Sequence, residues 1–161
     1  MSFLRYLMLL SLIVWIGGLI FFAFVVAPAA FSVLPTRHLA GNVVARTLGI
    51  LHWMGIMSGI IFLVASVLYS HISRGTPQIF AGRNILIVLM LVLTLISQFG
   101  MIPRMDTLRA SMGEIDSVPP DNPARMQFDA LHVWSTRVEG GVFSLGLVAV
   151  YLTAQLLATS S

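Results

Sequence analysis

The sequence predicts an all-α integral membrane protein, folded as one bundle of four transmembrane helices. Hydrophobic residues make up 58% of the 161 positions, charged residues only 9%, and the mean hydropathy is +0.95. A soluble domain would carry about a quarter of charged residues. Four uncharged stretches, at 6–34, 47–70, 84–102 and 140–158, each approach or exceed the ~20 residues that a bilayer core requires. At this length, residues 1–161 are expected to form a single transmembrane domain.

The expected helices cover about 3–34, 37–72, 77–113 and 123–159. Thr76 and Asn122 are predicted N-caps, because each directly precedes a proline, which is favoured at the first helical position. Pro28 and Pro103 lie inside the first and third helices, where a proline kinks the helix. The connection after Pro103 is expected to hold a helical extension on the membrane surface, followed by a proline turn.

The charged residues indicate how the chain crosses the membrane. All nine basic residues are arginines, and they lie at the ends of the apolar runs, which is typical of membrane topology and gives no indication of nucleic-acid binding. Five of them lie on the side of the first and third loops, namely Arg37, Arg46, Arg104, Arg109 and Arg125. Three lie on the side with both termini, namely Arg5, Arg74 and Arg83. Because positive loops stay in the cytoplasm, both termini are expected to be non-cytoplasmic. The absence of cysteine excludes disulfides, thiolate metal sites and cysteine nucleophiles.

Small residues predict where helices approach one another closely, since packing in lipid depends on close backbone contact. The segment from Gly55 to Gly59 is a complete G-x-x-x-G pattern. Comparable patches are Gly17 with Gly18, and Gly140 with Ser144. Such patches serve either helix packing inside the bundle or contact with a second copy of the chain, and the sequence leaves both open.

Polar residues near membrane depth predict a site at one end of the bundle. His52 lies six residues after Arg46, which is about 9 Å along a helix, and His132 lies eight residues before Gly140. The second and fourth helices enter from the same side, so both histidines are expected in one leaflet. The sequence places three side chains at a similar height, those of Gln98, Met57 and Met101. It places Ser135 and Glu139 on the same helix face as His132.

Each of these residues also has an ordinary structural interpretation. Methionine is a common filler of irregular apolar gaps. Glu139 can extend toward the lipid headgroups. A histidine at membrane depth is costly unless it has a partner, and such residues often mark functional sites. Hydrogen bonds from Ser135, Gln98 or Glu139 would satisfy His52 and His132 just as a bound ligand would, so ligation and internal hydrogen bonding remain alternatives.

Several short motifs carry a resemblance to a known family. They are Leu34-Pro35-Thr36-Arg37-His38, His52 with Gly55, Pro103-Arg104, and Phe128-x-x-x-His132-x-x-Ser135. Over essentially its whole length the chain resembles the transmembrane-protein-205-like family of small four-helix membrane proteins. Its Trp15-Ile16-Gly17-Gly18 is similar to a pattern in copper-resistance D-type membrane proteins, which resemble this family distantly, together with four-helix membrane protoporphyrinogen oxidases.

The resemblance implies little about activity, because the nearest family has no agreed biochemical function, only an association with resistance to metal-containing compounds. The copper and haem relatives imply His52 and His132 as ligands, and copper or haem b as the bound group. The spacing around Arg37 and His38 departs from the family pattern by one residue, so no role is carried over to His38.

Three classes of function follow from these observations. The first is a protein that binds or transports a soft metal ion or haem at the histidine- and methionine-lined mouth of the bundle. The second is a non-catalytic accessory subunit, packed against a larger membrane complex or a second copy of itself. The third, ranked last, is a haem-dependent membrane oxidoreductase, because no nucleophile and base, phosphate loop or zinc signature supports catalysis. The expected surroundings are the lipid bilayer of a bacterial inner membrane.

Overall fold

The computed structural model describes residues 2–158, and within that range every element is helical. The elements are α1 (Ser2–Phe21), η1 (Phe22–Val26), α2 (Ala27–Val33), α3 (Arg37–Arg74), α4 (Gly82–Ile96), η2 (Ser97–Met101), α5 (Ile102–Met112), η3 (Ile115–Ser117) and α6 (Pro123–Ala158). Segments η1 and η2 are π-helical, and η3 is a 3₁₀-helix. Four continuous helices, Ser2–Val33, Arg37–Arg74, Gly82–Met112 and Pro123–Ala158, are long and apolar enough to span a membrane, which confirms the predicted four-helix membrane bundle.

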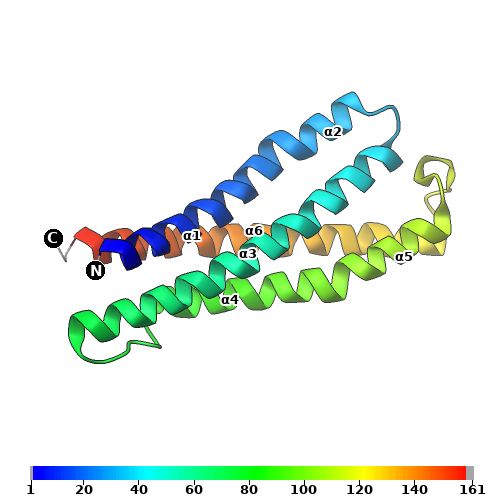
Figure 1. Cartoon of the computed structure of the whole chain (residues 1–161). Helices are drawn as coiled ribbons and strands as arrows, with labels where there is room; N and C mark the ends of the chain where they lie inside the picture. Colours follow the sequence, from blue (N-terminus) through cyan, green and yellow to red (C-terminus); the bar gives the residue numbers. More distant parts are fainter. Residues whose placement is uncertain (1, 159–161) are drawn as a thin grey trace.

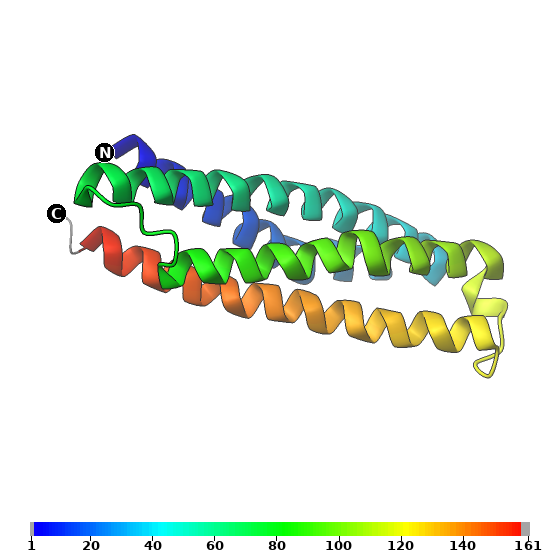
Figure 2. The same cartoon turned by 90° about the horizontal axis from the view of Figure 1, so that it is seen from below.

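The four spans form a closed ring of neighbours over much of their length. Helix α1 packs on α3, α3 on α4, and α4 on α6, which also contacts α1 (Figure 1). The first residues of α1 and the last residues of α6 lie at the same end of the bundle, and α5 continues the line of α4 along α6 (Figure 2). Beyond η1, α2 stays in contact with α3 but diverges from α6 (Figure 1). The bundle is therefore less tightly closed at the end away from the termini.

Contacts between Trp15 and two glycines hold α1 against α3. Trp15 is 2% exposed. A Cβ atom added at Gly55 would lie 2.5 Å from Trp15 Nε1, and one added at Gly59 would lie 2.8 Å from Trp15 Cζ3 and 2.7 Å from Leu91 Cδ2. Because these distances leave no room for a methyl group, the G-x-x-x-G pattern serves packing inside the bundle. Gly18 has the same role, since its Cβ would lie 2.6 Å from Leu51 Cδ1.

The other predicted packing positions have no such contact. No atom of another element lies within 4 Å of a Cβ built at Gly17 or Gly140. Ser144 is exposed, and its hydroxyl donates to the Gly140 carbonyl at 2.8 Å. Gly146 on α6 was not predicted as a packing position, yet a Cβ there would overlap the side chain of Ile16. The close contact between α1 and α6 is therefore made at Gly146.

The third membrane helix begins at Gly82, so the prediction of an N-cap at Thr76 and a start at Pro77 is wrong. Residues 75–81 instead form a connection that polar contacts hold in place. The Gln78 backbone N–H donates to Ser70 Oγ at 2.9 Å, and Asn84 Nδ2 donates to the Gln78 carbonyl at 3.0 Å. These tertiary contacts outweigh the local preference of a proline for the first helical turn.

The predicted start of α6 is confirmed, because the Asn122 side chain accepts from the Ala124 backbone N–H at 2.9 Å. The prolines inside the first and third spans each follow a π-helical segment, η1 before Pro28 and η2 before Pro103. The helical extension after Pro103 is α5, which packs along α6 and ends at Met112. It prolongs the third span along the bundle (Figure 2). Our expectation that this extension lies across the membrane surface was therefore wrong.

Candidate functional site

His52 is the centre of a buried polar chain that joins three of the four spans. Its side chain, from the middle of α3, is 2% exposed. His52 Nδ1 lies 2.9 Å from Gln98 Oε1 of η2, and His52 Nε2 lies 2.7 Å from Glu139 Oε1 of α6. Both ring nitrogens are therefore within hydrogen-bonding distance of protein atoms. This is the internal hydrogen bonding that the sequence left as an alternative to ligation of His52.

The positions of the protons in this chain follow from its donors and acceptors. A neutral imidazole carries one donor and one acceptor nitrogen. Two oxygen partners are compatible with a doubly protonated ring, with a Gln98 amide turned so that its nitrogen donates to His52 Nδ1, or with a Glu139 carboxyl that donates its own proton to His52 Nε2. In each arrangement a proton lies between His52 Nε2 and Glu139 Oε1. A metal ion could reach His52 only by displacing one of these hydrogen bonds.

Glu139 is only half satisfied by this chain. Its Oε1 atom pairs with His52, whereas its Oε2 atom is buried and has no hydrogen-bond partner among the described residues. The side chain as a whole is 17% exposed. A buried carboxylate oxygen without a donor is destabilising, so Oε2 is a position where a donor from outside the chain would be favourable.

A cavity of about 620 Å³ opens beside Glu139, between α2 and α6 where these helices diverge. Its apolar wall comes from the first span and α6, with further side chains from α3 and α5. That wall includes Leu19, Phe22, Phe24, Phe31, Phe128 and Phe143. Its polar lining is concentrated toward the loops, and consists of Arg37, His38, Asp106, Arg109, Asp116, Arg125, Asp129, His132, Ser135, Thr136 and Glu139. The cavity thus combines aromatic walls with titratable groups.

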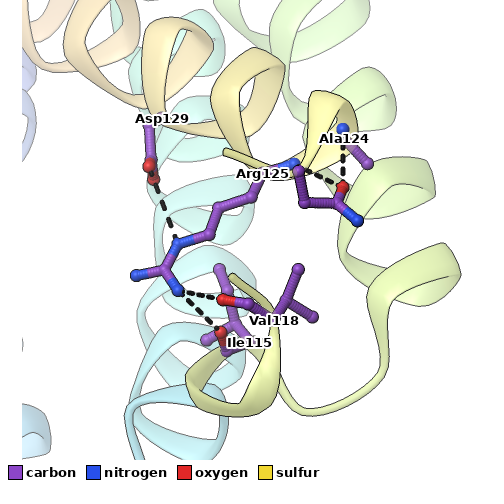
Figure 3. Close-up of polar contacts among 6 residues, drawn as sticks. Ile115, Val118, Ala124, Arg125 and Asp129 are labelled. Carbon is purple, nitrogen blue, oxygen red and sulfur yellow. Dashed lines mark hydrogen bonds and ion pairs between the residues drawn. The ribbon is translucent and has the colours of Figure 1, made fainter. Parts of the chain in front are cut away.

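Most charges at the mouth of the cavity are already paired. Arg125, near the start of α6, donates to the carbonyls of Ile115 and Val118 and lies 4.0 Å from Asp129 (Figure 3). These contacts fix the loop containing η3 against α6. Because the Arg125 guanidinium already contacts a carboxylate and two carbonyls, few of its N–H groups are available to a ligand.

Two further contacts involve charged groups at the mouth. Arg109 Nη1 lies 3.3 Å from Asp106 Oδ1, and its guanidinium stands 5.2 Å from the centre of the Phe128 ring. Asp116 accepts from the Arg37 backbone N–H at 3.2 Å, so its carboxylate lies at the N-terminus of α3, where the helix dipole favours negative charge.

The structure separates the two histidines that the sequence placed in one site. His132 lines the cavity, but its side chain is exposed and its ring stacks parallel to Phe128, with centroids 6.3 Å apart. It lies seven residues, or about 10 Å of helix, before Glu139, to which His52 is bonded. Ser135, which is buried, and Glu139 line the same cavity as His132.

The predicted methionines lie elsewhere. Met57 is 55% exposed on the outside of the bundle, and Met101 is partly buried; neither is among the residues that line the cavity, whereas Met105 is. Within residues 2–158 no three His, Asp or Glu side chains gather closely enough to hold a metal ion. Of the predicted site residues, Ser135, Glu139 and His132 line one cavity. His52 is hydrogen-bonded to Glu139.

Sequence reasoning missed one further cavity residue, His38. Its Nδ1 atom is buried without a hydrogen-bond partner in the described part of the chain. The family resemblance carried no role over to it, and no periodic pattern distinguished it. Arg109 and Arg125 were considered only as topology signals, because their pairing depends on the folding of the third loop.

Comparison with known proteins places the chain in a family without supplying an activity. No curated protein matches it. No solved structure matches it. The family model described as "Domain of unknown function (DUF4149)" matches residues 10–114, which is more than half of the chain and includes His52 and Gln98 but ends before Glu139. The chain therefore belongs to the DUF4149 family.

Proposed function

We propose that this protein binds a small ligand in the cavity between its first and fourth spans, and acts as a membrane carrier or receptor for it. The observation that carries the proposal is the cavity itself, of about 620 Å³, with aromatic walls and a carboxylate at its inner end. Small-molecule sites are commonly clefts of about 300–1,000 Å³ with apolar linings and a few polar groups, and they often lie between the helices of a bundle.

Haem or a soft metal ion is a second candidate for the same cavity. Two imidazoles, those of His38 and His132, line it, and imidazole is a good ligand for haem iron and copper. In this version His132 is the first candidate ligand, because both nitrogens of His52 are already hydrogen-bonded. A haem-dependent oxidoreductase would require the same ligation, followed by turnover of a substrate.

The accessory-subunit alternative now depends on other surfaces. Gly55 and Gly59 are covered by Trp15 and Leu91 inside the bundle, so they are not available to a partner. Gly140 and Ser144 remain exposed and would be the positions for contact with a larger membrane complex or a second copy.

The ligand-binding proposal is tested on protein purified from membranes in a mild detergent. Native mass spectrometry, a visible spectrum and metal analysis identify what co-purifies. Ala45→Trp fills the cavity from α3, and Ala154→Trp adds the same side chain at an exposed position of α6 outside the cavity. We expect a bound molecule in the wild type and in the Ala154→Trp control, and its loss in Ala45→Trp.

The outcomes separate the candidates. A haem spectrum or stoichiometric copper that is lost in His132→Ala would support the second candidate. A colourless organic ligand that is lost in Ala45→Trp would support the first. The binding proposal fails if the wild type co-purifies with no small molecule and if Ala45→Trp reduces the binding of no added molecule. A larger protein that co-purifies in that case would favour the accessory subunit.

We also propose a bacterial inner membrane location with the first and third loops in the cytoplasm. The arginine distribution supports this orientation, and both ends of the described chain lie on one side of the bundle (Figure 1). A topology reporter fused after Ser161 should then be active only outside the cytoplasm. Cytoplasmic activity of that fusion would reverse the orientation.

A further inference from the structure

The free oxygen of Glu139 specifies what kind of group the cavity can stabilise. Glu139 Oε2 is buried, lies on a side chain that lines the cavity, and has no donor among the described residues. Carboxylate oxygens bind cationic donors more strongly than neutral ones. A ligand group that carries a positive charge and an N–H bond would therefore satisfy this atom best.

Three arginines near Glu139 or at the cavity already contact other groups. Arg109 is paired with Asp106 and stacked on Phe128, and Arg125 is held by Asp129 and two loop carbonyls. Arg137 precedes Glu139 by two residues, and its guanidinium lies 5.1 Å from the centre of the Trp134 ring. Because these three guanidinium groups already have partners, a cationic group of the ligand is the donor that we expect at Glu139 Oε2.

The walls of the cavity fit the remainder of such a ligand. Five phenylalanines line it, namely Phe22, Phe24, Phe31, Phe128 and Phe143. Aromatic faces attract organic cations, and they also accept an apolar body out of water. Phe24 and Phe31 are at the same time 73% and 51% exposed on the outside of the bundle, so the aromatic wall is continuous with the lipid-facing surface.

We infer that the ligand of this cavity is a lipophilic organic ammonium ion, whose nitrogen donates a hydrogen bond to Glu139 Oε2 while its apolar body lies among the phenylalanines. This inference rests on the proposed ligand-binding function and names its ligand class. His52 is then a positioning residue, because its bond to Glu139 Oε1 at 2.7 Å fixes the orientation of the carboxylate.

The test uses three fluorescent probes that share one dansyl group and differ in the terminal group and its charge. Dansylcadaverine ends in a primary ammonium, its N-acetyl derivative is neutral, and dansyl-6-aminohexanoic acid ends in a carboxylate. Each is titrated into the full-length protein in lipid nanodiscs, with empty nanodiscs subtracted. A hydrogen bond between charged groups predicts roughly 10-fold or greater preference for the ammonium probe over the acetylated one.

Matched variants assign the preference to one carboxylate. Glu139→Gln should weaken binding of the ammonium probe about 10-fold and leave the acetylated probe unchanged. Asp129→Asn removes a carboxylate from the mouth of the same cavity, at a side chain that is 62% exposed and paired with Arg125, and should preserve the preference. Thermal unfolding in the same nanodiscs verifies that each variant folds.

Each result has a defined meaning. Equal affinity for the ammonium and acetylated probes, or an undiminished preference in Glu139→Gln, would overturn the inference. If Ala45→Trp still abolishes the binding of all probes in that case, the cavity remains a ligand site and only the ligand class is wrong. If Ala45→Trp reduces the binding of none of the probes, the inference and the ligand-binding proposal both lose their support. Should Glu139→Gln fail to fold, the comparison of the three probes on the wild type decides alone.

Discussion

Replacing Gly55 by alanine tests the packing of the first two spans. The new Cβ atom would lie 2.5 Å from Trp15 Nε1, 2.7 Å from Cε2 and 3.0 Å from Cδ1. Ordinary contact begins near 3.4–4 Å, so the indole ring would have to move by about 1 Å. Trp15 is 2% exposed and enclosed by the core, so the ring cannot move without displacing its neighbours. Overpacking of this kind costs about 1–3 kcal/mol.

The measurement is thermal unfolding in detergent, followed by circular dichroism. For a chain of this size about 1 kcal/mol corresponds to 2–4 °C in Tm, so Gly55→Ala should lower Tm by several degrees. Gly140→Ala is the matched control, since no atom of another element lies within 4 Å of its Cβ. Combining Gly55→Ala with Trp15→Phe should recover part of the loss, because the smaller ring leaves space. Equal Tm values for Gly55→Ala and Gly140→Ala would refute this account of the packing.

Three further changes probe the polar contacts. His52→Ala leaves the Gln98 amide and Glu139 Oε1 without their hydrogen-bond partner and should destabilise the fold by roughly 1–3 kcal/mol. Chemical unfolding measures this beside the control His71→Ala, which changes an exposed residue. Equal stability of the two variants would contradict the expectation. Asn122→Ala removes the α6 cap and should cost about 1 kcal/mol in the same assay. Arg125→Gln frees the carbonyls of Ile115 and Val118 and should speed amide hydrogen exchange in residues 113–121 without changing Tm; unchanged exchange there would show that other contacts hold the loop.

The transmembrane fold could be predicted because it depends on features that are local in the sequence. A run of about 20 apolar residues has one stable arrangement in a bilayer, a helix that satisfies its own backbone. The heights of residues along such helices follow from counting. That counting brought Gln98 and Glu139 close enough to His52 to be considered as its hydrogen-bond partners, which is how the structure places them.

Features that depend on contacts between helices could not be predicted in this way. Gly146 is a single glycine with no partner at i+4, so no pattern marked it, yet it receives Ile16 from α1. Helical spacing correctly put His132 on the same cavity-lining face of α6 as Glu139. It gave no information on the first span, which diverges from α6 at that height and leaves His132 exposed (Figure 1).

Two π-helical segments connect the prolines of the chain to its candidate site. Pro28 and Pro103 each lie two residues after such a segment, η1 and η2. A proline ring collides with the carbonyl four residues earlier, and here that carbonyl lies inside the π-helical turn, which is wider than an α-helical one. The backbone N–H groups of Ala27 and Ile102 donate instead to residues five positions back. The prolines thus fit within continuous spans.

The side chains carried by these segments are the ones that build the site. Segment η1 supplies Phe22 and Phe24 to the wall of the cavity, and the helix that follows it diverges from α6. Segment η2 supplies Gln98 to His52. A π-helical turn shifts the face on which all later residues lie, because it inserts one extra residue into the helical repeat. The opening beside Glu139 and the polar chain behind it therefore depend on the same local feature, present once in the first span and once in the third.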